Sequence, residues 1–138
     1  MKARLLVVDE HPSTRELLVR HFGGRGMSVT AMPDGAGGLL AIEKAPFDVV
    51  ILDLEMPGLS GLAVLRRIRE QHSAADLPVI MISGRQDTES IVASLELGAN
   101  DYITKPIDLA VALARVNALL ARRRLEVIRR STDSLTGL

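Results

Sequence analysis

Acidic, hydroxyl and amine side chains directly follow short apolar runs of this 138-residue chain. In chain order they are Asp9, Glu10, Asp53, Ser83 and Lys105. If the runs are parallel strands, their carboxyl ends share one edge of a sheet, which is where open α/β sheets bind ligands. The sequence therefore predicts a crevice lined by three carboxylates, a hydroxyl and an amine.

Phosphoryl transfer is the chemistry that this set of side chains favours. Three clustered carboxylates repel one another unless a cation lies between them, and Mg²⁺ prefers such oxygen ligands and bridges readily to phosphate. Lys105 could neutralise one phosphoryl oxygen and Ser83 could donate to another. Asp53 is then the expected nucleophile, forming an aspartyl phosphate.

The elements that must position these residues are predicted from alternating strand-length apolar runs and longer helical segments. The expected strands are Arg4 to Val8, Ser28 to Met32, Val49 to Leu52, Val79 to Ile82 and Tyr102 to Thr104. This alternation is typical of an α/β protein with a doubly wound parallel sheet. A final helix is expected from Asp108 to Arg130, followed by a turn-rich end.

Composition restricts the class of protein. The 47% hydrophobic content suffices for one packed domain, and the absence of cysteine excludes disulfides and thiolate chemistry. The first apolar run is too short for a signal peptide, and no segment approaches the ~20 residues of a membrane span. Charge is balanced and only three residues are aromatic. We therefore expect a cytoplasmic chain that contacts neither a membrane nor, by itself, nucleic acid.

A family resemblance is carried by four motifs in order. They are Asp9-Glu10 after the first strand, the stretch from Asp53 to Gly61, Ser83, and Gly98 to Tyr102 leading to Lys105-Pro106. From about Lys2 to Leu120 the chain resembles the receiver domains of bacterial two-component response regulators. The resemblance implies a flavodoxin-like (βα)₅ fold with strand order 2-1-3-4-5.

The resemblance also implies a phosphoacceptor site. A histidine kinase would donate the phosphoryl group to Asp53. Mg²⁺ would be held by Asp9, Glu10, Asp53 and the backbone carbonyl of Glu55. Glu10 stands where the family often has Asp, so its longer side chain would shift the metal. His11 lies near the same acidic edge; it is interpreted as a loop histidine, with a metal ligand as the alternative.

Three further roles follow from the same resemblance. Lys105 would bind the phosphoryl oxygens, and a cis bond before Pro106 is a state that proline permits. Ser83 and Tyr102 would form a switch pair, in which the hydroxyl moves to the phosphoryl group and the ring turns inward. Taken singly, Ser83 reads as a turn cap and Tyr102 as a core aromatic residue.

Two other classes compete with a phosphoaccepting receiver. Haloacid-dehalogenase-type phosphatases also use an aspartyl nucleophile and Mg²⁺, but their acid pair follows the first strand, whereas Asp53 and Glu55 follow the third. A receiver that only binds partners would lack part of the acid, hydroxyl and lysine set, which is complete here. Uptake of beryllofluoride would separate that class from the first.

The chain divides into a receiver domain, residues 1–121, and a segment 122–138 that is expected to hold a linker helix and the start of a truncated output domain. Asp133 to Leu138 resembles the opening of GGDEF diguanylate cyclase domains. The catalytic part of such a domain is missing, so we expect this chain itself not to be an enzyme. Another effector, or a receiver that stands alone, remains the alternative.

Activation is expected to produce a homodimer through the fourth helix, fifth strand and fifth helix. In the winged-helix transcription-factor branch of the family that this chain resembles, that face carries charged pairs. Here Ile91 and Val111 stand at the positions of one such pair, while Asp101 and Arg115 could form another. The fifth helix is expected to continue as a parallel coiled coil. Its predicted seam contains Leu109, Leu113, Val116, Leu120 and Val127, and is interrupted by Arg123. The alternative is that Leu109 to Leu120 packs on the sheet and the residues after Arg122 form a solvated tail.

Overall fold

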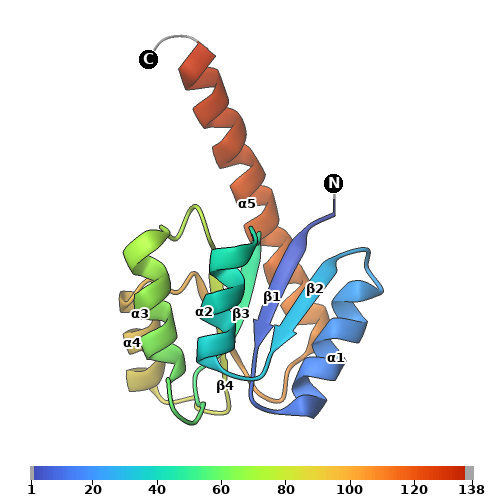
Figure 1. The fold of residues 1–138 in the computed structure, drawn as a ribbon, viewed down its shortest axis with the longest axis vertical. Coiled ribbons are helices and arrows are strands. Elements are labelled where there is room, and N and C mark those ends of the chain that lie inside the picture. Colours follow the sequence, from blue (N-terminus) through green and yellow to red (C-terminus); the bar gives the residue numbers. More distant parts are fainter. Residues whose placement is uncertain (1, 136–138) are drawn as a thin grey trace.

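The computed structural model describes residues 2–135, with side chains placed as far as Arg130. Five strands alternate with five helices (Figure 1). The strands are β1 (Arg4–Val8), β2 (Ser28–Met32), β3 (Val49–Asp53), β4 (Val79–Ser83) and β5 (Asp101–Thr104). The helices are α1 (Pro12–Gly23), α2 (Gly35–Lys44), α3 (Gly61–Gln71), α4 (Thr88–Glu96) and α5 (Leu109–Leu135).

All strand pairs are parallel, and the sheet order is β2-β1-β3-β4-β5. This confirms the predicted doubly wound, flavodoxin-like fold. Strands β3 and β4 are buried along their whole length, as expected for strands covered on both faces. Helices α2, α3 and α4 cover one face and α1 and α5 the other (Figure 1).

Strand ends differ from the sequence prediction by one residue, and the difference bears on the site. β3 ends at Asp53 and β4 at Ser83, so both functional side chains belong to the ladder itself. Helix α1 begins at Pro12, because proline is well suited to the first helical position.

Helix α3 begins directly beneath the end of β3. Ser60 caps it by accepting a hydrogen bond from the backbone N–H of Ala63. A Cβ atom at Gly61 would lie 2.3 Å from the carbonyl oxygen of Asp53, so only glycine permits this approach. The glycine therefore fixes how close the helix lies to the end of the central strand.

Helix α5 is longer than predicted. It continues to Leu135, so the expectation of a turn-rich end after Arg130 is wrong for residues 131–135, and residues 136–138 lie outside the described part. No glycine or proline interrupts the chain between Asp108 and Leu135, so nothing in that stretch stops the helix. Its second half projects from the body of the domain (Figure 1).

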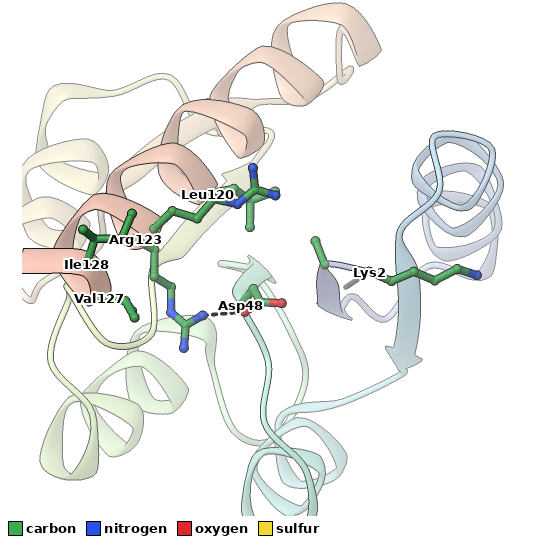
Figure 2. Close-up of a pocket in the computed structure, with 8 residues that line it drawn as sticks. Lys2, Asp48, Leu120, Arg123, Val127 and Ile128 are labelled. Carbon is green, nitrogen blue, oxygen red and sulfur yellow. Dashed lines mark hydrogen bonds and ion pairs between the residues drawn. The ribbon is translucent and has the colours of Figure 1, made fainter. Parts of the chain in front are cut away.

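The predicted coiled-coil seam is wrong over the first half of α5. Val116 and Leu120 are buried in the core of the domain, where they pack against the sheet and α1. Arg123 does not face a partner helix either: it pairs with Asp48 and donates from Nε to the carbonyl oxygen of Asp76. Figure 2 shows this contact in the groove that Val127 also lines.

Within residues 2–135, no helix combines the length and apolar character that crossing a bilayer requires.

Candidate functional site

Asp53 lies at the carboxyl end of the central strand and is 1% exposed. Burial, followed by the negative charge of Asp9, raises the pKa of the Asp53 carboxyl from 3.8 to about 6. The Lys105 ammonium and the backbone N–H of Glu55, 3.3 Å from Oδ1, act in the opposite direction. The carboxylate is therefore mainly ionised at neutral pH, which a nucleophile requires.

Asp9 and Lys105 converge on Asp53 from the ends of β1 and β5. Asp9 is fully buried, and Lys105 Nζ lies 3.0 Å from its Oδ2 and 3.5 Å from Oδ2 of Asp53. The bond between Lys105 and Pro106 is cis, the state that the sequence allowed. The ammonium group thus lies between two buried carboxylates, where it can also reach a phosphoryl oxygen on Asp53.

The Ser83 hydroxyl is bound by Glu55, whose side chain was given no role by the family resemblance. The Ser83 hydroxyl donates to Oε1 of Glu55 at 2.5 Å and accepts from the backbone N–H of Arg85 at 2.9 Å. Arg85 Nε lies 3.7 Å from the same Glu55 oxygen. The hydroxyl hydrogen of Ser83 is therefore already donated to Glu55.

Tyr102 is partly buried against the core, and its hydroxyl donates to the carbonyl oxygen of Arg85 at 2.8 Å. Arg85 follows Ser83 by two residues, in the short loop after β4. The Ser83 hydroxyl accepts from its backbone N–H, and the Tyr102 hydroxyl donates to its carbonyl oxygen. The proposed switch residues are thus linked through backbone atoms of Arg85.

The side chain of His11 lies against the two buried acids, and that of Glu10 is partly exposed. The Glu10 side chain is 35% exposed, and its Oε1 lies 3.7 Å from His11 Nε2. His11 Nδ1 lies 3.1 Å from Oδ1 of Asp9 and 4.0 Å from Oδ2 of Asp53. Among the described residues, Asp9, His11 and Asp53 form a group of side chains spaced to hold a metal ion.

Comparison with known proteins agrees with this geometry. The family model described as "Response regulator receiver domain" matches residues 5–117. The chain belongs to the response regulator receiver family. Receivers of this family accept phosphoryl groups from histidine kinases and are joined to output domains.

Three relatives illustrate the range of proteins that contain such a receiver. The chain is 42% identical to the transcriptional regulatory protein CseB of Streptomyces avermitilis over 121 residues, which is 88% of this chain and 50% of that protein. The NtrX structure from Brucella abortus, in complex with ADP, superposes with a TM-score of 0.89 at 30% identity, covering all of this chain and 30% of that one. A putative response regulator/GGDEF domain structure gives 0.85 at 25% identity, covering 89% and 51%.

The chain spans about half the length of curated relatives such as CseB. Family membership, together with relatives named as transcriptional regulators, confirms the expectation that this domain is a regulatory receiver rather than an enzyme. The relatives do not favour a GGDEF output over a DNA-binding one, since curated relatives carry names such as "DNA-binding response regulator MtrA".

Proposed function

We propose that Asp53 accepts a phosphoryl group from a sensor histidine kinase. The observation that carries this proposal is the convergence of Asp53, Asp9 and Lys105 at the open edge of the sheet. A carboxylate oxygen of Asp53 would bond to phosphorus as the bond between phosphorus and the donor's nitrogen breaks. Lys105 would offset the charge that the phosphoryl oxygens bring to this buried edge.

A divalent cation, proposed to be Mg²⁺, fits this site. Oδ2 of Asp9 and Oδ2 of Asp53 are both buried, form no hydrogen bond of good geometry, and share the Lys105 ammonium at 3.0 Å and 3.5 Å. Such oxygens suit a hard cation, which would neutralise the acids and the incoming phosphoryl group. Asp9 and Asp53 would hold it, with Glu10 and the carbonyl oxygen of Glu55 as the further ligands that the family resemblance implies.

The proposed switch begins with the Ser83 hydroxyl. Phosphorylation would draw that hydroxyl from Glu55 to a phosphoryl oxygen, since the phosphoryl group carries more negative charge and more acceptor oxygens than the Glu55 carboxylate. The loop at Arg85 would move with it, and Tyr102 would lose its acceptor there and turn inward. The hydrogen bonds from Ser83 to Glu55 and from Tyr102 to Arg85 support this order of events.

Incubation with acetyl phosphate and Mg²⁺ tests the phosphoacceptor proposal. The parent protein should take up one phosphoryl group as a base-labile acyl phosphate. Both Asp53→Asn and chelation of the metal should abolish this uptake. Labelling of the Asp53→Asn protein at the parental rate would contradict the proposal. Failure to bind beryllofluoride, together with no phosphorylation by any donor, would favour a receiver that only binds partners.

The output that this receiver controls is open to two candidates. The resemblance of Asp133 to Leu138 to a GGDEF opening supports a diguanylate cyclase, although residues 136–138 lie outside the described part. The names of curated relatives support a DNA-binding output instead, so contact of the parent protein with nucleic acid stays open. We propose the cyclase, in the cytoplasm as is typical of response regulators. Reading the parent gene beyond Leu138 decides between the two.

We also propose that activation forms a homodimer through α4, β5 and α5. Arg115 pairs with Asp101 at 2.6 Å within one chain, and Val111 is 39% exposed on the same helix. An exposed apolar repeat, with alternating steps of three and four residues, continues from there along α5. It comprises Val111, Ala114, Ala118, Ala121, Leu125 and Ile128.

This exposed repeat replaces the predicted seam as the surface for helix pairing. Leu125 and Ile128 are 68% and 61% exposed, and the alanines allow two helices to approach closely. Arg122, Arg124 and Arg129 flank the repeat, so like-charge repulsion should keep pairing weak until receiver contacts raise the local concentration.

Sedimentation of the beryllofluoride-treated protein tests the dimer. Leu125→Glu should shift it toward monomer, because a charge would be buried in the pairing surface. Val127→Glu is the matched control, since Val127 is also exposed but lines the groove beside Asp48. Equal effects of the two changes would place the interface elsewhere, and Ile91→Glu then tests whether α4 contributes.

A further inference from the structure

His11 lies against the acid cluster, although phosphoacceptor chemistry at Asp53 assigns it no task. It is the N-cap residue of α1, but its side chain makes no capping hydrogen bond. Its backbone N–H instead donates to Oδ1 of Asp9 at 2.8 Å, and Pro12 follows at the start of the helix. The backbone of His11 is thus fixed on both sides, with the ring directed at the carboxylates.

The spacing of the donor atoms matches that of ligands around one ion. An octahedral ion with bonds of about 2.1 Å places adjacent ligands about 3.0 Å apart and opposite ligands about 4.2 Å apart. His11 Nδ1 lies 3.1 Å from Oδ1 of Asp9 and 4.0 Å from Oδ2 of Asp53. The imidazole therefore already stands at ligand distance from both acids.

The charge of the two buried acids is a second observation beside the spacing. Oδ2 of Asp9 and Oδ2 of Asp53 form no hydrogen bond of good geometry and share the Lys105 ammonium, at 3.0 Å and 3.5 Å, so two buried carboxylates face one positive charge and a divalent ion can neutralise the excess. The Lys105 ammonium contacts Oδ2 of Asp9, whereas the His11 ring contacts Oδ1. The two side chains therefore do not compete for the same carboxylate oxygen. The His11 side chain is 55% exposed, which gives an ion access from solvent.

The chemistry of the donor set then decides which ion it favours. Mg²⁺ prefers oxygen ligands, whereas imidazole nitrogen suits transition metals. We propose that His11 is a nitrogen ligand of the divalent ion at this site, and that it raises the affinity for Mn²⁺ relative to Mg²⁺. This inference rests on the proposed phosphoacceptor function, because Asp9 and Asp53 serve both.

Pulsed electron paramagnetic resonance of the Mn²⁺-loaded protein detects the ligand directly. Bound Mn²⁺ should show electron spin echo modulation from a coordinated ¹⁴N nucleus in the parent protein. The modulation should disappear in His11→Phe, which keeps a ring of similar shape, and persist in the control His72→Asn. Only three histidines are present, so these variants locate the nitrogen.

Calorimetric titration with Mn²⁺ and with Mg²⁺ measures the selectivity. Even a residue that only supports a ligand contributes about 10- to 100-fold to metal affinity, so His11→Phe should weaken Mn²⁺ binding by about tenfold or more. Mg²⁺ affinity should change much less. Far-ultraviolet circular dichroism checks that the variant is folded, since its spectrum should match that of the parent protein.

Two results would overturn the inference. The absence of ¹⁴N modulation from Mn²⁺ bound to the parent protein would exclude nitrogen ligation. Equal losses of Mn²⁺ and Mg²⁺ affinity in His11→Phe would show that His11 only orients Asp9 through their hydrogen bond. Either result leaves the phosphoacceptor function intact if Mg²⁺ still supports labelling of Asp53, whereas failure of that labelling overturns the proposed function separately.

Discussion

Removing the charge of Asp53 should stabilise the metal-free protein. The carboxylate is buried beside Asp9, and its pKa is raised from 3.8 to about 6 despite the attraction of Lys105. A raised pKa means that the folded protein holds the ionised form less favourably than the unfolded chain does. Asp53→Asn should therefore increase the free energy of unfolding near neutral pH.

The size and pH range of this effect follow from the same pKa. A rise of about two units corresponds to about 3 kcal/mol, as an upper estimate, at 1.36 kcal/mol per unit. Below about pH 4 the carboxyl is protonated in both states and the penalty vanishes. It should grow between about pH 4 and pH 6, and stay constant above.

Urea denaturation in the presence of a chelator provides the assay. The Asp53→Asn variant should exceed the parent protein by up to about 3 kcal/mol at about pH 8 and by little at about pH 4. Adding Mg²⁺ should stabilise the parent protein more than the variant, because the ion supplies the missing countercharge. Glu96→Gln, which removes an exposed acid of α4, serves as the control.

Equal unfolding free energies at about pH 8 would refute this reasoning, since the buried charge would then cost nothing. A difference that stays undiminished at about pH 4 would refute it as well, because titration of Asp53 could not be its cause.

Three further changes probe the surroundings of the site. Glu55→Ala should raise beryllofluoride affinity by about tenfold or more in calorimetry, because the Ser83 hydrogen bond to this carboxylate, typically about 1.5–3 kcal/mol, no longer competes. Arg123→Ala should speed amide hydrogen exchange in residues 121–130, read by mass spectrometry, since it removes contacts with the domain body. Gly61→Ala should lower the free energy of unfolding in urea by about 1–3 kcal/mol or more, because its Cβ would meet the Asp53 carbonyl oxygen.

Matched controls make each of these outcomes specific. Glu89→Ala removes an exposed acid near the start of α4, and Arg122→Ala an exposed arginine next to Arg123. Gly23→Ala adds a methyl group where no atom lies within 4 Å. Any of the three test variants that behaves like its control would contradict the contact assigned to it.

Much of the fold and part of the site could be predicted from the sequence. The buried strands read as nearly continuous apolar runs, so their positions were predicted within a residue. Asp9, Asp53 and Lys105 meet because they follow strands of one parallel sheet, which is a consequence of topology alone. The strand order itself came from the family resemblance, since periodicity does not determine it.

The remaining features depend on side-chain directions and long-range contacts. Nothing in the spacing of Glu55 and Ser83 indicates that their side chains meet, and Asp48 pairs with Arg123 across 75 residues. The one available signal for His11 was its place directly after the acidic pair. The sequence of α5 contains two sets of apolar residues with steps of three and four, and only the packing shows which set faces the core.

Chemical mapping of the acyl phosphate tests the central claim most directly. The protein is phosphorylated with acetyl phosphate and Mg²⁺, reduced with borohydride, digested, and sequenced by mass spectrometry. Reduction converts an aspartyl phosphate to homoserine at the modified position. We predict homoserine at Asp53 and at no other acid of the chain. Homoserine at Asp9 or another acid, with Asp53 unchanged, would contradict the account.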